Sequence, residues 1–327
     1  MTFKALLLEN LPEFSVRVAD LEPAQLPEGE VLIRVSHSTL NYKDALAIGN
    51  TSPIVRAWPM VAGIDAAGVV ESATSPDFQP GDAVVVNGWG QGETRWGGLA
   101  HYVRVPADWP VRLPAPYGPF EAAAVGTAGY TAAMSVQALE RHGLRPEDGP
   151  VLVTGATGGV GSIAVLLLAR AGFEVWAVTG KAADAEYLKG LGAAQVLPRA
   201  EFAVPGKPLQ KERLAGVVDA LGSHALANAC AQVRRGGAVA ACGLAMGMDF
   251  PATVAPFILR GVSLYGIDSV YASRARREGA WALLAARIAP ADLAGIVQVI
   301  GLSETVAAAQ RLLVGQVTGR YVVDVNR

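Results

Sequence analysis

The segment Val151-Leu-Val-Thr-Gly-Ala-Thr-Gly-Gly-Val-Gly161 runs straight into Ser162-Ile-Ala-Val-Leu-Leu-Leu-Ala-Arg170. It predicts a short apolar strand, a glycine-rich turn and an amphipathic helix. Backbone N–H groups in such a turn can approach a pyrophosphate closely, and the positive end of the helix dipole favours the anion. Gly158 and Gly161 follow Ala156 in an Ala-x-Gly-x-x-Gly spacing. The segment therefore predicts a dinucleotide site and redox chemistry; a tight turn without a ligand is the alternative.

The end of the next predicted strand indicates which dinucleotide is bound. In NAD sites an acidic residue about 20 residues after the fingerprint holds the ribose 2′-OH. The strand at 173–178 is instead followed by Thr179, Gly180 and Lys181. A hydroxyl and an ammonium group both suit a 2′-phosphate, so NADP(H) is favoured over NAD(H). The alternative is that Lys181 only begins a solvated helix over 181–191.

Composition narrows the class of protein. A chain of 327 residues suggests about two domains, and 51% hydrophobic against 17% charged residues is ample for large cores. A net charge of −2 gives no basic footprint for nucleic acid or an anionic membrane. Cys230 and Cys242 are the only cysteines, so we expect no disulfide framework and a cytoplasmic protein.

No targeting or membrane segment is expected. The N-terminus lacks a basic region followed by an apolar one, as a signal peptide would have. The stretch 122–139 carries no charge, but it is built of Ala, Gly, Thr, Ser and Gln and is too weakly apolar for a membrane helix. We expect it to be a buried helix.

The order of predicted strands and helices along the chain indicates an α/β protein with two domains. Short β-rich runs punctuated by Gly and Pro lie at 31–35, 68–71, 82–86 and 101–105. From about residue 121, helical patterns alternate with strands at 151–154, 174–178, 195–197, 216–219, 238–241 and 263–266. The tail adds helices at 276–288 and 303–314 and a strand at 320–325. We predict a barrel-like β domain over 1–121 and 269–327, and a doubly wound parallel sheet over 122–268.

Further motifs are spread over the whole chain. They are Leu40-Asn-Tyr-Lys-Asp-Ala-Leu46, Gly63-Ile-Asp-Ala-Ala-Gly68, Gly88-Trp-Gly90, Trp96-Gly-Gly-Leu-Ala100, Gly126-Thr-Ala-Gly-Tyr-Thr131, Leu197-Pro-Arg199, Ala240-Ala-Cys-Gly-Leu-Ala245, Pro256-Phe-Ile-Leu-Arg260 and Gly266-Ile-Asp-Ser269. With these motifs the chain resembles the medium-chain dehydrogenase/reductase superfamily, its zinc-free quinone-oxidoreductase-like branch and, more narrowly, the NADPH-dependent acryloyl-CoA reductases. The resemblance implies a GroES-like β-barrel catalytic domain and a Rossmann NADP-binding domain.

The medium-chain dehydrogenase/reductase superfamily contains zinc-dependent and zinc-free members. Zinc-dependent members carry a ligand Cys and a Gly-His-Glu in the first domain, whereas this chain has no Cys before Cys230 and has Gly63-Ile64-Asp65 at that place. Its four histidines (His37, His101, His142 and His224) show no metal-ligand spacing, so we expect no metal. Without a Lewis acid to stabilise an alkoxide, reduction of an activated C=C bond fits better than alcohol oxidation.

A rival interpretation is a short-chain dehydrogenase. Thr154, Gly155, Gly159 and Gly161 also satisfy the Thr-Gly-x-x-x-Gly-x-Gly pattern of that family. Its members normally begin with this fingerprint and need a Tyr-x-x-x-Lys. Here the motif starts near residue 151 and no tyrosine has a lysine four residues on, so we set this interpretation aside.

The run Asn41-Tyr42-Lys43-Asp44 is the candidate catalytic segment, and we expect it on a loop after a strand. By resemblance, Tyr42 borders both the nicotinamide and the substrate, and Asn41 and Asp44 shape the same wall. The Tyr42 hydroxyl could hydrogen-bond a thioester oxygen or relay a proton. The alternative is a polar turn in which Asp44 caps a helix.

The resemblance also assigns the cofactor site. Gly158, Gly159, Val160 and Gly161 match the pyrophosphate turn, and Thr179, Gly180 and Lys181 match the 2′-phosphate loop, although many relatives have Ser and Arg there. Arg199 matches a position near the adenine and its phosphate. Leu244, Ile258, Ser269 and Asn326 match positions that line the rest of the cofactor, together with Tyr42. Taken alone, Arg199 suits a surface cation, and Leu244 and Ile258 suit ordinary core.

The predicted reaction is hydride transfer from NADPH to the β-carbon of acryloyl-CoA or a similar enoyl thioester. Two other functions stay open, an NADPH:quinone oxidoreductase and a non-catalytic NADPH-binding protein.

A loop around Trp89 and Trp96 is either a wall of the acyl pocket or ordinary packing. Arg56, Arg104 and Arg112 are candidate ligands of CoA phosphates, or simply solvated. The resemblance implies a homodimer.

Overall fold

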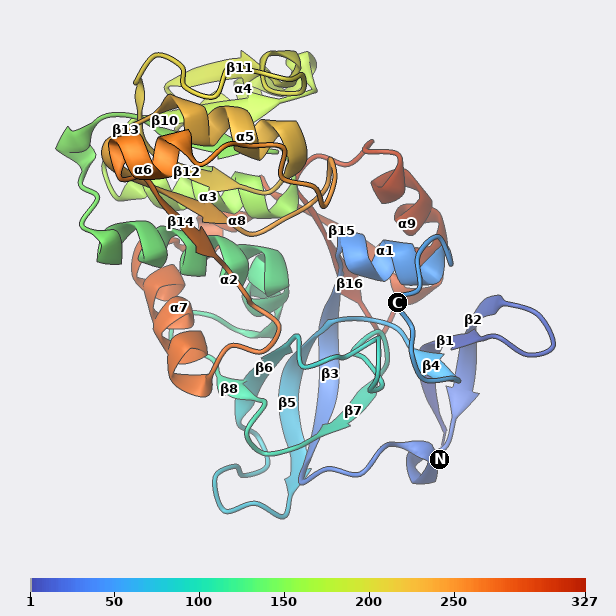
Figure 1. Cartoon of the computed structure of the whole chain (residues 1–327). Coiled ribbons are helices and arrows are strands. Elements are labelled where there is room, and N and C mark those ends of the chain that lie inside the picture. The colour runs from blue at the N-terminus through green and yellow to red at the C-terminus, as the bar shows by residue number, and fades with distance from the viewer. Residues whose placement is uncertain (1) are drawn as a thin grey trace. The chain divides into compact units, whose positions relative to one another are not determined.

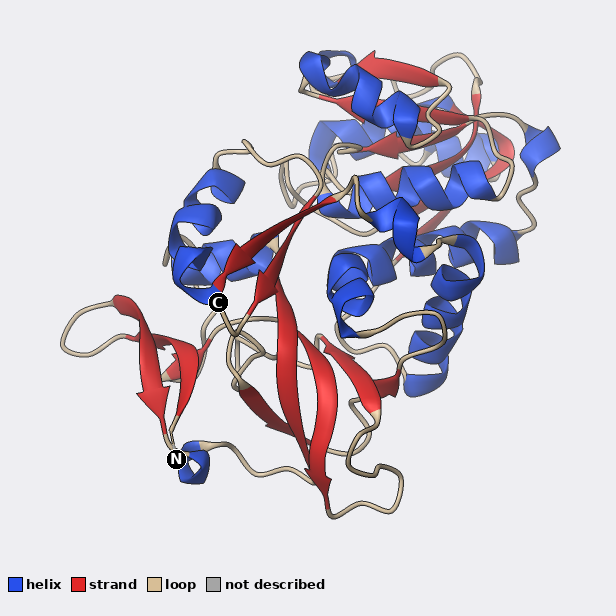
Figure 2. Cartoon of the chain, turned by 180° about the vertical axis from the view of Figure 1, so that it is seen from behind, coloured by secondary structure: helices blue, strands red, loops and turns tan. Residues whose placement is uncertain are grey.

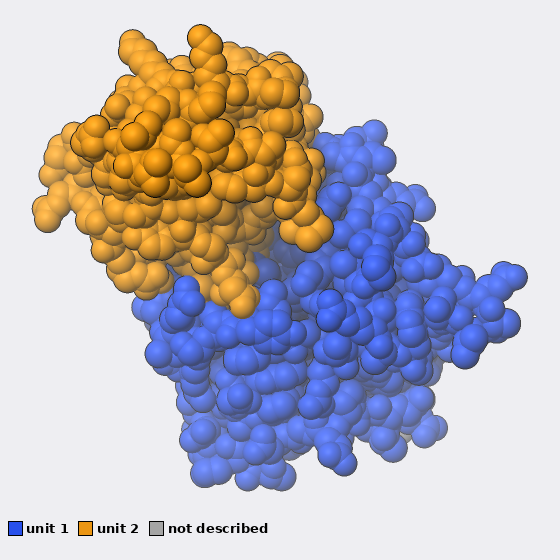
Figure 3. All heavy atoms as spheres, viewed as in Figure 1, with its two compact units in different colours: residues 1–127, 270–285, 289–327 blue, residues 128–269, 286–288 orange. Residues whose placement is uncertain are grey.

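A computed structural model describes residues 2–327 of the chain. The chain divides into two compact units, coloured separately in Figure 3. Unit 1 comprises residues 1–127, 270–285 and 289–327, and unit 2 comprises residues 128–269 and 286–288. The chain passes from unit 1 to unit 2 within one helical stretch, which is kinked at Gly126 (φ 50°, ψ −167°). The domain boundaries stated above, 121/122 and 268/269, remain a prediction.

Unit 2 is a doubly wound parallel sheet. Its strands are β9 (Val151–Thr154), β10 (Val175–Thr179), β11 (Gln195–Pro198), β12 (Leu214–Asp219), β13 (Val233–Ala241) and β14 (Ser263–Gly266). All neighbours are parallel, in the order β11-β10-β9-β12-β13-β14. The order reverses direction from β9, as in Rossmann sheets. This confirms the predicted fold class.

The helices of unit 2 follow the alternating pattern expected from the sequence. They are α2 (Pro119–His142, shared with unit 1), α3 (Gly159–Arg170), α4 (Ala185–Gly190), α5 (Ser223–Gln232) and α6 (Ala255–Arg260), coloured blue in Figure 2. Strands β9 and β12 are buried along their whole length. A sheet covered on both faces needs such continuous apolar strands, which is why these runs show no alternation in the sequence.

Unit 1 consists mainly of antiparallel β structure. One sheet has the order β15-β16-β3-β5-β6-β8, and β7 also pairs with β3; a smaller sheet has the order β2-β1-β4 (Figure 1). The strands are β1 (Phe3–Glu9), β2 (Ser15–Leu21), β3 (Val31–Leu40), β4 (Met60–Val61), β5 (Asp65–Ala73), β6 (Ala83–Asn87), β7 (Tyr102–Val105), β8 (Val111–Arg112), β15 (Val297–Gly301) and β16 (Arg320–Asp324). The helices are α1 (Tyr42–Ile48), α7 (Arg274–Arg287, which ends in unit 2), α8 (Pro290–Leu293) and α9 (Thr305–Leu313).

The C-terminal strand returns the chain to the first sheet. Strand β16 pairs antiparallel with β3, with Tyr321 opposite Leu40, and parallel with β15. Helices α1 and α9 lie against each other beside this sheet. Val323, Ile33 and Leu6 belong to one buried apolar cluster, so residues far apart in the chain share one core.

The sequence located most elements but missed several. Strands β1, β2, β4, β8 and β15 were not predicted; of these, β4 and β8 span two residues each, which is too short for a periodic pattern. The stretch 122–139 lies in the buried helix α2, as expected. Among residues 2–327, no helix is long and apolar enough to cross a membrane.

Candidate functional site

The glycine turn (residues 155–161) joins β9 to α3. Gly155 adopts a positive φ of 61°, which starts the turn without a steric penalty. The Gly158 N–H donates to Gly155 O (3.0 Å), and the Ala156 N–H donates to Val178 O in β10 (3.0 Å). Gly158 is the N-terminal cap residue of α3. The turn is therefore held by backbone bonds at the carboxyl edge of the sheet.

Gly161 lets the helix approach the turn closely. A Cβ at Gly161 would lie 2.3 Å from Gly155 O and 2.5 Å from Ala156 Cα, both backbone atoms. The Ser162 N–H already donates to Gly158 O (2.9 Å), whereas the N–H groups of Gly159, Val160 and Gly161 precede the first helical carbonyl that could accept them. These N–H groups and the helix dipole form a site suited to a pyrophosphate.

A hollow of about 580 Å³ lies beside the end of β10. Its lining residues are Thr179, Gly180, Ala182, Ala185, Val196, Leu197, Pro198, Arg199, Ala200 and Ala203, with no carboxylate among them. A Cβ at Gly180 would lie 2.8 Å from Arg199 Cζ, so glycine makes room for the guanidinium. The structure thus brings Thr179, Gly180 and Arg199 together, as the site prediction requires.

Lys181 stands apart from the other predicted residues of this loop. It does not line the hollow, its N–H donates to Thr179 Oγ1 (3.0 Å), and partial burial lowers the pKa of its ammonium. The Thr179 hydroxyl also lies 3.1 Å from the Thr157 hydroxyl in the glycine turn. Thr179 therefore connects the turn to the hollow, whereas Arg199 supplies the charge inside it.

Sequence reasoning missed Asp219, at the end of β12. Its Oδ1 accepts a hydrogen bond from Thr154 Oγ1 (2.7 Å), and its Oδ2 accepts one from the Gly222 N–H (2.8 Å). Burial raises the pKa of this carboxyl group. Asp219 fixes the loop after β12 against the end of β9. A carboxylate at a strand end next to the fingerprint strand was the available signal.

The remaining predicted cofactor residues of unit 2 differ in exposure. Leu244 is 53% exposed and Ile258 is 72% exposed, so neither is ordinary core of its unit. Ser269 is buried and accepts a hydrogen bond from Thr131 Oγ1 (2.8 Å). Two large exposed apolar side chains in the segment between β13 and β14 are compatible with contact to the flat faces of a nucleotide.

In unit 1, the segment Asn41–Asp44 is the start of a helix, and the prediction that it lies on a loop was wrong. Asn41 is the N-cap of α1 and Tyr42 is its first residue. The Asn41 N–H donates to Asp44 Oδ2 (2.8 Å), so Asp44 caps the helix. The Ile64 N–H donates to Asp44 Oδ1 (2.9 Å). Tyr42 is 43% exposed and is presented to solvent by this rigid turn.

Asp44 is fully enclosed. The pKa of its carboxyl group is raised to about 7: burial is the main cause and the neighbouring charge of Asp65 adds to it, while the N–H groups of Asn41 and Ile64 act in the opposite direction. The capping role considered as the alternative is thus observed. Whether Asp44 also takes part in the chemistry stays a prediction.

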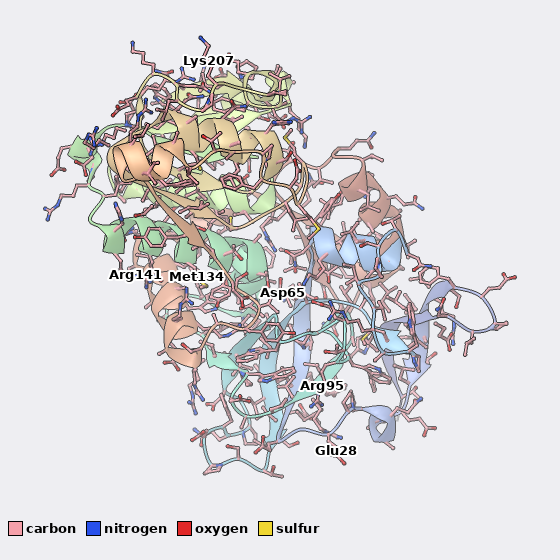
Figure 4. All side chains as sticks on the ribbon, in the orientation of Figure 1. Glu28, Asp65, Arg95, Met134, Arg141 and Lys207 are labelled. Atoms are coloured by element: carbon pink, nitrogen blue, oxygen red, sulfur yellow. The ribbon has the colours of Figure 1, made fainter. Side chains whose placement is uncertain are left out.

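Asp65, labelled in Figure 4, is the centre of a buried polar group that we call the carboxylate cluster: Asp65, Asp44, Arg320, Thr39, Asn41, Asn87 and Thr127. Asp65 Oδ2 accepts hydrogen bonds from Thr39 Oγ1 (2.5 Å), Asn41 Nδ2 (2.9 Å) and the Thr127 N–H (2.9 Å). Its Oδ1 accepts from Asn87 Nδ2 (2.7 Å) and Thr127 Oγ1 (2.5 Å). Every acceptor position of this carboxylate is therefore in use.

Arg320, in β16, supplies the positive charge of the carboxylate cluster. It is 4% exposed, and its Nη2 lies 3.4 Å from Asn41 Oδ1. A Cβ on the kink residue Gly126 would collide with Arg320 Nη2 and lie 2.9 Å from Asp65 Oδ2. Burial lowers the pKa of Arg320, and Asp65 and Asp44 counteract this. Sequence reasoning missed Arg320, because its hydrogen-bond partner Asn41 lies 279 residues earlier in the chain.

The Gly/Trp loop (residues 88–98) of unit 1 is tightly anchored. The Trp89 ring stacks on Trp109 (centroids 5.6 Å apart, planes 5° apart), and the Arg277 guanidinium lies 4.3 Å from the Trp89 ring centroid. Trp89 itself has a positive φ of 58°. The Trp96 indole donates to Pro59 O (3.0 Å). This packing supports the alternative of a packed loop, and a role in an acyl pocket stays a prediction.

The predicted site residues fall into two sets. Tyr42, Asn41, Asp44 and Asn326 belong to unit 1, and the others belong to unit 2. Asn326 is exposed and its N–H donates to Asp324 Oδ1 (3.0 Å). Within residues 2–327, no group of three or more His, Cys, Asp or Glu side chains could hold a metal ion.

Comparison with known proteins decides the family. Residues 27–115 match the alcohol dehydrogenase GroES-like domain, and residues 159–286 match the zinc-binding dehydrogenase domain. The chain is 48% identical over 328 residues to the acrylyl-CoA reductase AcuI of Ruegeria pomeroyi, covering 99% of both chains. The chain belongs to the medium-chain dehydrogenase/reductase superfamily. The resemblance drawn from its motifs is confirmed.

Other members of the superfamily are similar over the whole length. The chain is 46% identical over 325 residues to the Bacillus subtilis protein named "Putative quinone oxidoreductase YhfP", covering 98% of both chains. The YhfP structure, with NAD bound, has a TM-score of 0.94 and covers 99% of this chain and all of that one. The yhdH oxidoreductase of Salmonella enterica, in complex with NADP, has a TM-score of 0.97, 47% identity and coverage of 98% and 99%.

Proposed function

We propose that this protein catalyses the NADPH-dependent reduction of the activated C=C bond of a short enoyl thioester, with acryloyl-CoA converted to propionyl-CoA. The observation that carries the proposal is the full-length match to an acrylyl-CoA reductase at 48% identity. The site adds independent support. A helix N-terminus suited to a pyrophosphate and a guanidinium-lined hollow lie in one unit, and an exposed tyrosine on a rigid helical turn lies in the other.

The residues present fit NADPH. The first turn of α3 offers N–H groups for the pyrophosphate, and Thr179 and Arg199 offer a hydroxyl and a cation for the 2′-phosphate, with Gly180 leaving room between them. The absence of a carboxylate from the lining of that hollow favours NADP(H) over NAD(H). When bound, NADPH supplies the hydride that adds to the β-carbon of the substrate.

The catalytic group of this chain is the phenol of Tyr42. As negative charge develops on the thioester oxygen, the Tyr42 hydroxyl donates a hydrogen bond to it, or it passes its proton to the α-carbon. Asn41 and Asp44 hold the first turn of α1 through the capping bonds, so the phenol is already oriented before substrate binds. Most of the rate enhancement comes from this positioning.

The test is a comparison of NADPH oxidation with a panel of short enoyl-CoA thioesters and a benzoquinone, for the wild type and Tyr42→Phe. We expect turnover on acryloyl-CoA, and a kcat for the variant at least about tenfold lower, as for loss of a proton donor. Unchanged kcat and KM for Tyr42→Phe would remove the tyrosine from the chemistry. NADPH binding without turnover on any acceptor would instead favour a non-catalytic nucleotide-binding protein.

A second candidate is an NADPH:quinone oxidoreductase. It is supported by the similarity to YhfP, whose sequence identity to this chain (46%) is close to that of the acrylyl-CoA reductase (48%). The two functions differ in the acceptor and share the nucleotide site. Faster turnover on the benzoquinone than on any enoyl thioester would favour this candidate.

The proposal includes a reaction that does not use zinc. Asp65 stands where zinc-dependent relatives carry Glu, and both of its oxygens are occupied by five hydrogen bonds from this chain. Metal analysis of the purified enzyme, together with activity after chelation, tests this. Loss of activity on chelation that is restored by zinc would contradict it.

The proposal also includes a homodimer in the cytoplasm. Strand β14 ends the sheet order of unit 2, and its Leu264 is 37% exposed. Such an edge can pair with the same strand of a second copy. Light scattering on the wild type and Leu264→Lys tests the dimer, and we expect the variant to be monomeric.

The cytoplasmic location is proposed from the cysteines. Both are free thiols, in keeping with a reducing compartment, and cell fractionation tests the localisation.

A further inference from the structure

Coenzyme A carries a phosphorylated nucleotide at the end opposite its thioester, so a protein that selects CoA thioesters needs cations for those phosphates. Three arginines were candidates from the sequence: Arg56, Arg104 and Arg112. All three belong to unit 1, the unit that carries Tyr42. The structure separates them by what each side chain already contacts.

Two of these arginines are engaged or poorly placed for an anion. Arg112 Nη2 lies 3.0 Å from Asp82 Oδ2, and the guanidinium also lies over the Phe78 ring. Arg104 lines a hollow of about 410 Å³ together with Glu28 and Glu30, whose carboxylates disfavour a phosphate.

Within the part of the chain that the structure describes, Arg56 is the one of the three that combines exposure with an unpaired side chain. It is exposed, and across residues 2–327 its side chain makes no hydrogen bond or ion pair. Its backbone is nevertheless fixed, because the Arg56 N–H donates to Glu93 O in the Gly/Trp loop (2.8 Å). A free guanidinium on a tethered backbone loses less conformational freedom on binding than one on a free loop.

The charges around Arg56 favour an anion. Glu93 is the nearby carboxylate, and its Oε1 lies 2.6 Å from Lys43 Nζ, with only 12% of the Glu93 side chain exposed. Arg95, labelled in Figure 4, is exposed two residues further on, and its Nη1 donates to Glu28 O (3.4 Å). Arg56 is therefore bonded through its backbone to a loop whose carboxylate, Glu93, is already paired with Lys43 and which also carries the exposed Arg95.

The Gly/Trp loop is directly connected to the candidate catalytic turn. Lys43, the partner of Glu93, is the residue after Tyr42 in α1. The helix that begins with Tyr42 and the segment that carries Arg56 are thus both bonded to Glu93 of the Gly/Trp loop.

We propose that Arg56, assisted by Arg95, binds a phosphate of the nucleotide part of a CoA thioester. The inference rests on the proposed function and adds to it a determinant of substrate class. Its consequence is that Arg56 favours CoA thioesters over small thioesters and quinones, which carry no phosphate.

The test compares acryloyl-CoA with its truncated analogue acryloyl-N-acetylcysteamine, which keeps the thioester and lacks the phosphates. For Arg56→Ala we expect the KM for acryloyl-CoA to rise about fivefold with kcat unchanged, as for loss of one exposed charge pair. The KM for the analogue stays unchanged. Arg56→Glu, which reverses the charge, gives a larger rise. Added salt raises the KM of the wild type for acryloyl-CoA more than that of Arg56→Ala.

Arg34→Ala is the matched control, because Arg34 is an exposed arginine of the same unit already paired with Glu71 (3.0 Å). It should change neither KM. The inference is overturned if Arg56→Ala leaves the KM for acryloyl-CoA unchanged, or raises both KM values equally. If the wild type turns over neither thioester, the proposed function itself fails; binding of free CoA by the NADPH-loaded protein, weakened in Arg56→Glu, then still tests the phosphate subsite.

Discussion

The glycine turn of unit 2 and the carboxylate cluster of unit 1 are both built around polar groups, but from different parts of the chain. In the turn, the groups that face the ligand are backbone N–H groups within a few residues of one another. In the cluster, Asp65 takes its side-chain partners from 22 to 62 residues away. The turn needs no particular side chain and tolerates none at Gly161, whereas the cluster depends on every side chain in it. Substitutions should therefore damage the two regions in different ways.

The largest effect is expected for Gly161→Val. The new side chain would force the backbone of Gly155 and Ala156 away from α3, because its Cβ would lie within 2.5 Å of both. We expect NADPH affinity to fall at least about a hundredfold, together with a loss of thermal stability. Titration calorimetry and thermal unfolding measure the two effects.

Gly190→Ala is the control for that variant. Gly190 ends α4 of the same unit, and a Cβ there meets nothing within 4 Å. Its affinity and stability should match those of the wild type. Wild-type NADPH binding by Gly161→Val would show that close backbone packing at the turn is not required.

In the carboxylate cluster, Asp65→Asn should lower the free energy of unfolding by about 3–5 kcal/mol, the usual cost of leaving a buried charge uncompensated. The variant removes the carboxylate charge that offsets the buried Arg320, and it replaces one of the two acceptor oxygens by an NH2 group that faces other donors. Urea unfolding measures the change. Asp20→Asn, which removes an exposed pair with Lys4 (2.8 Å), should cost no more than about 1 kcal/mol. Equal costs for the two variants would contradict the central role of Asp65.

The hollow beside β10 depends on both backbone and side-chain groups, because Gly180 leaves the space that the Arg199 guanidinium occupies. Arg199→Ala should weaken NADPH binding about tenfold and leave NADH binding almost unchanged, because only NADPH carries the 2′-phosphate. Lys189→Ala, in an exposed pair on α4, is the control and should affect neither. An equal loss of affinity for NADPH and NADH would mean that Arg199 supports the fold and does not bind the 2′-phosphate.

The burial of Asp44 makes the stability of the first unit depend on pH. Its pKa in the folded protein is about 7, well above the ordinary value of 3.8, so the folded state binds the proton more tightly than the unfolded state. The contribution of Asp44 to stability is then full below pH 4 and falls as the pH rises towards 7, by at most about 1.4 kcal/mol per pH unit. Unfolding of the wild type and Asp44→Asn between pH 4 and 8 measures this. The stability of the variant relative to the wild type should improve as the pH rises, and a constant difference would contradict the burial effect.

The two regions also differ in how far sequence reasoning reached. The turn was identified residue by residue, and the hollow in part, since Lys181 lies outside its lining. In the first unit, Tyr42, Asn41 and Asp44 were named as candidate residues, and their catalytic role stays a prediction; their helical conformation was not predicted, because a seven-residue helix leaves little periodicity to detect. Arg320, Asn87 and Arg277 were missed altogether, because nothing in their neighbouring residues distinguishes them from ordinary strand or helix residues.

By itself, the sequence determined the parallel sheet, the glycine turn and the superfamily, because local backbone geometry and apolar periodicity are written in consecutive residues. Only the tertiary structure decided that Asp44 caps a helix, that Asp65 and Arg320 share one buried cluster, and that Arg56 alone among three arginines is exposed and unpaired in the described chain. Those properties depend on which side chains meet after folding, and the burial that sets their charge states exists only once distant strands have packed together.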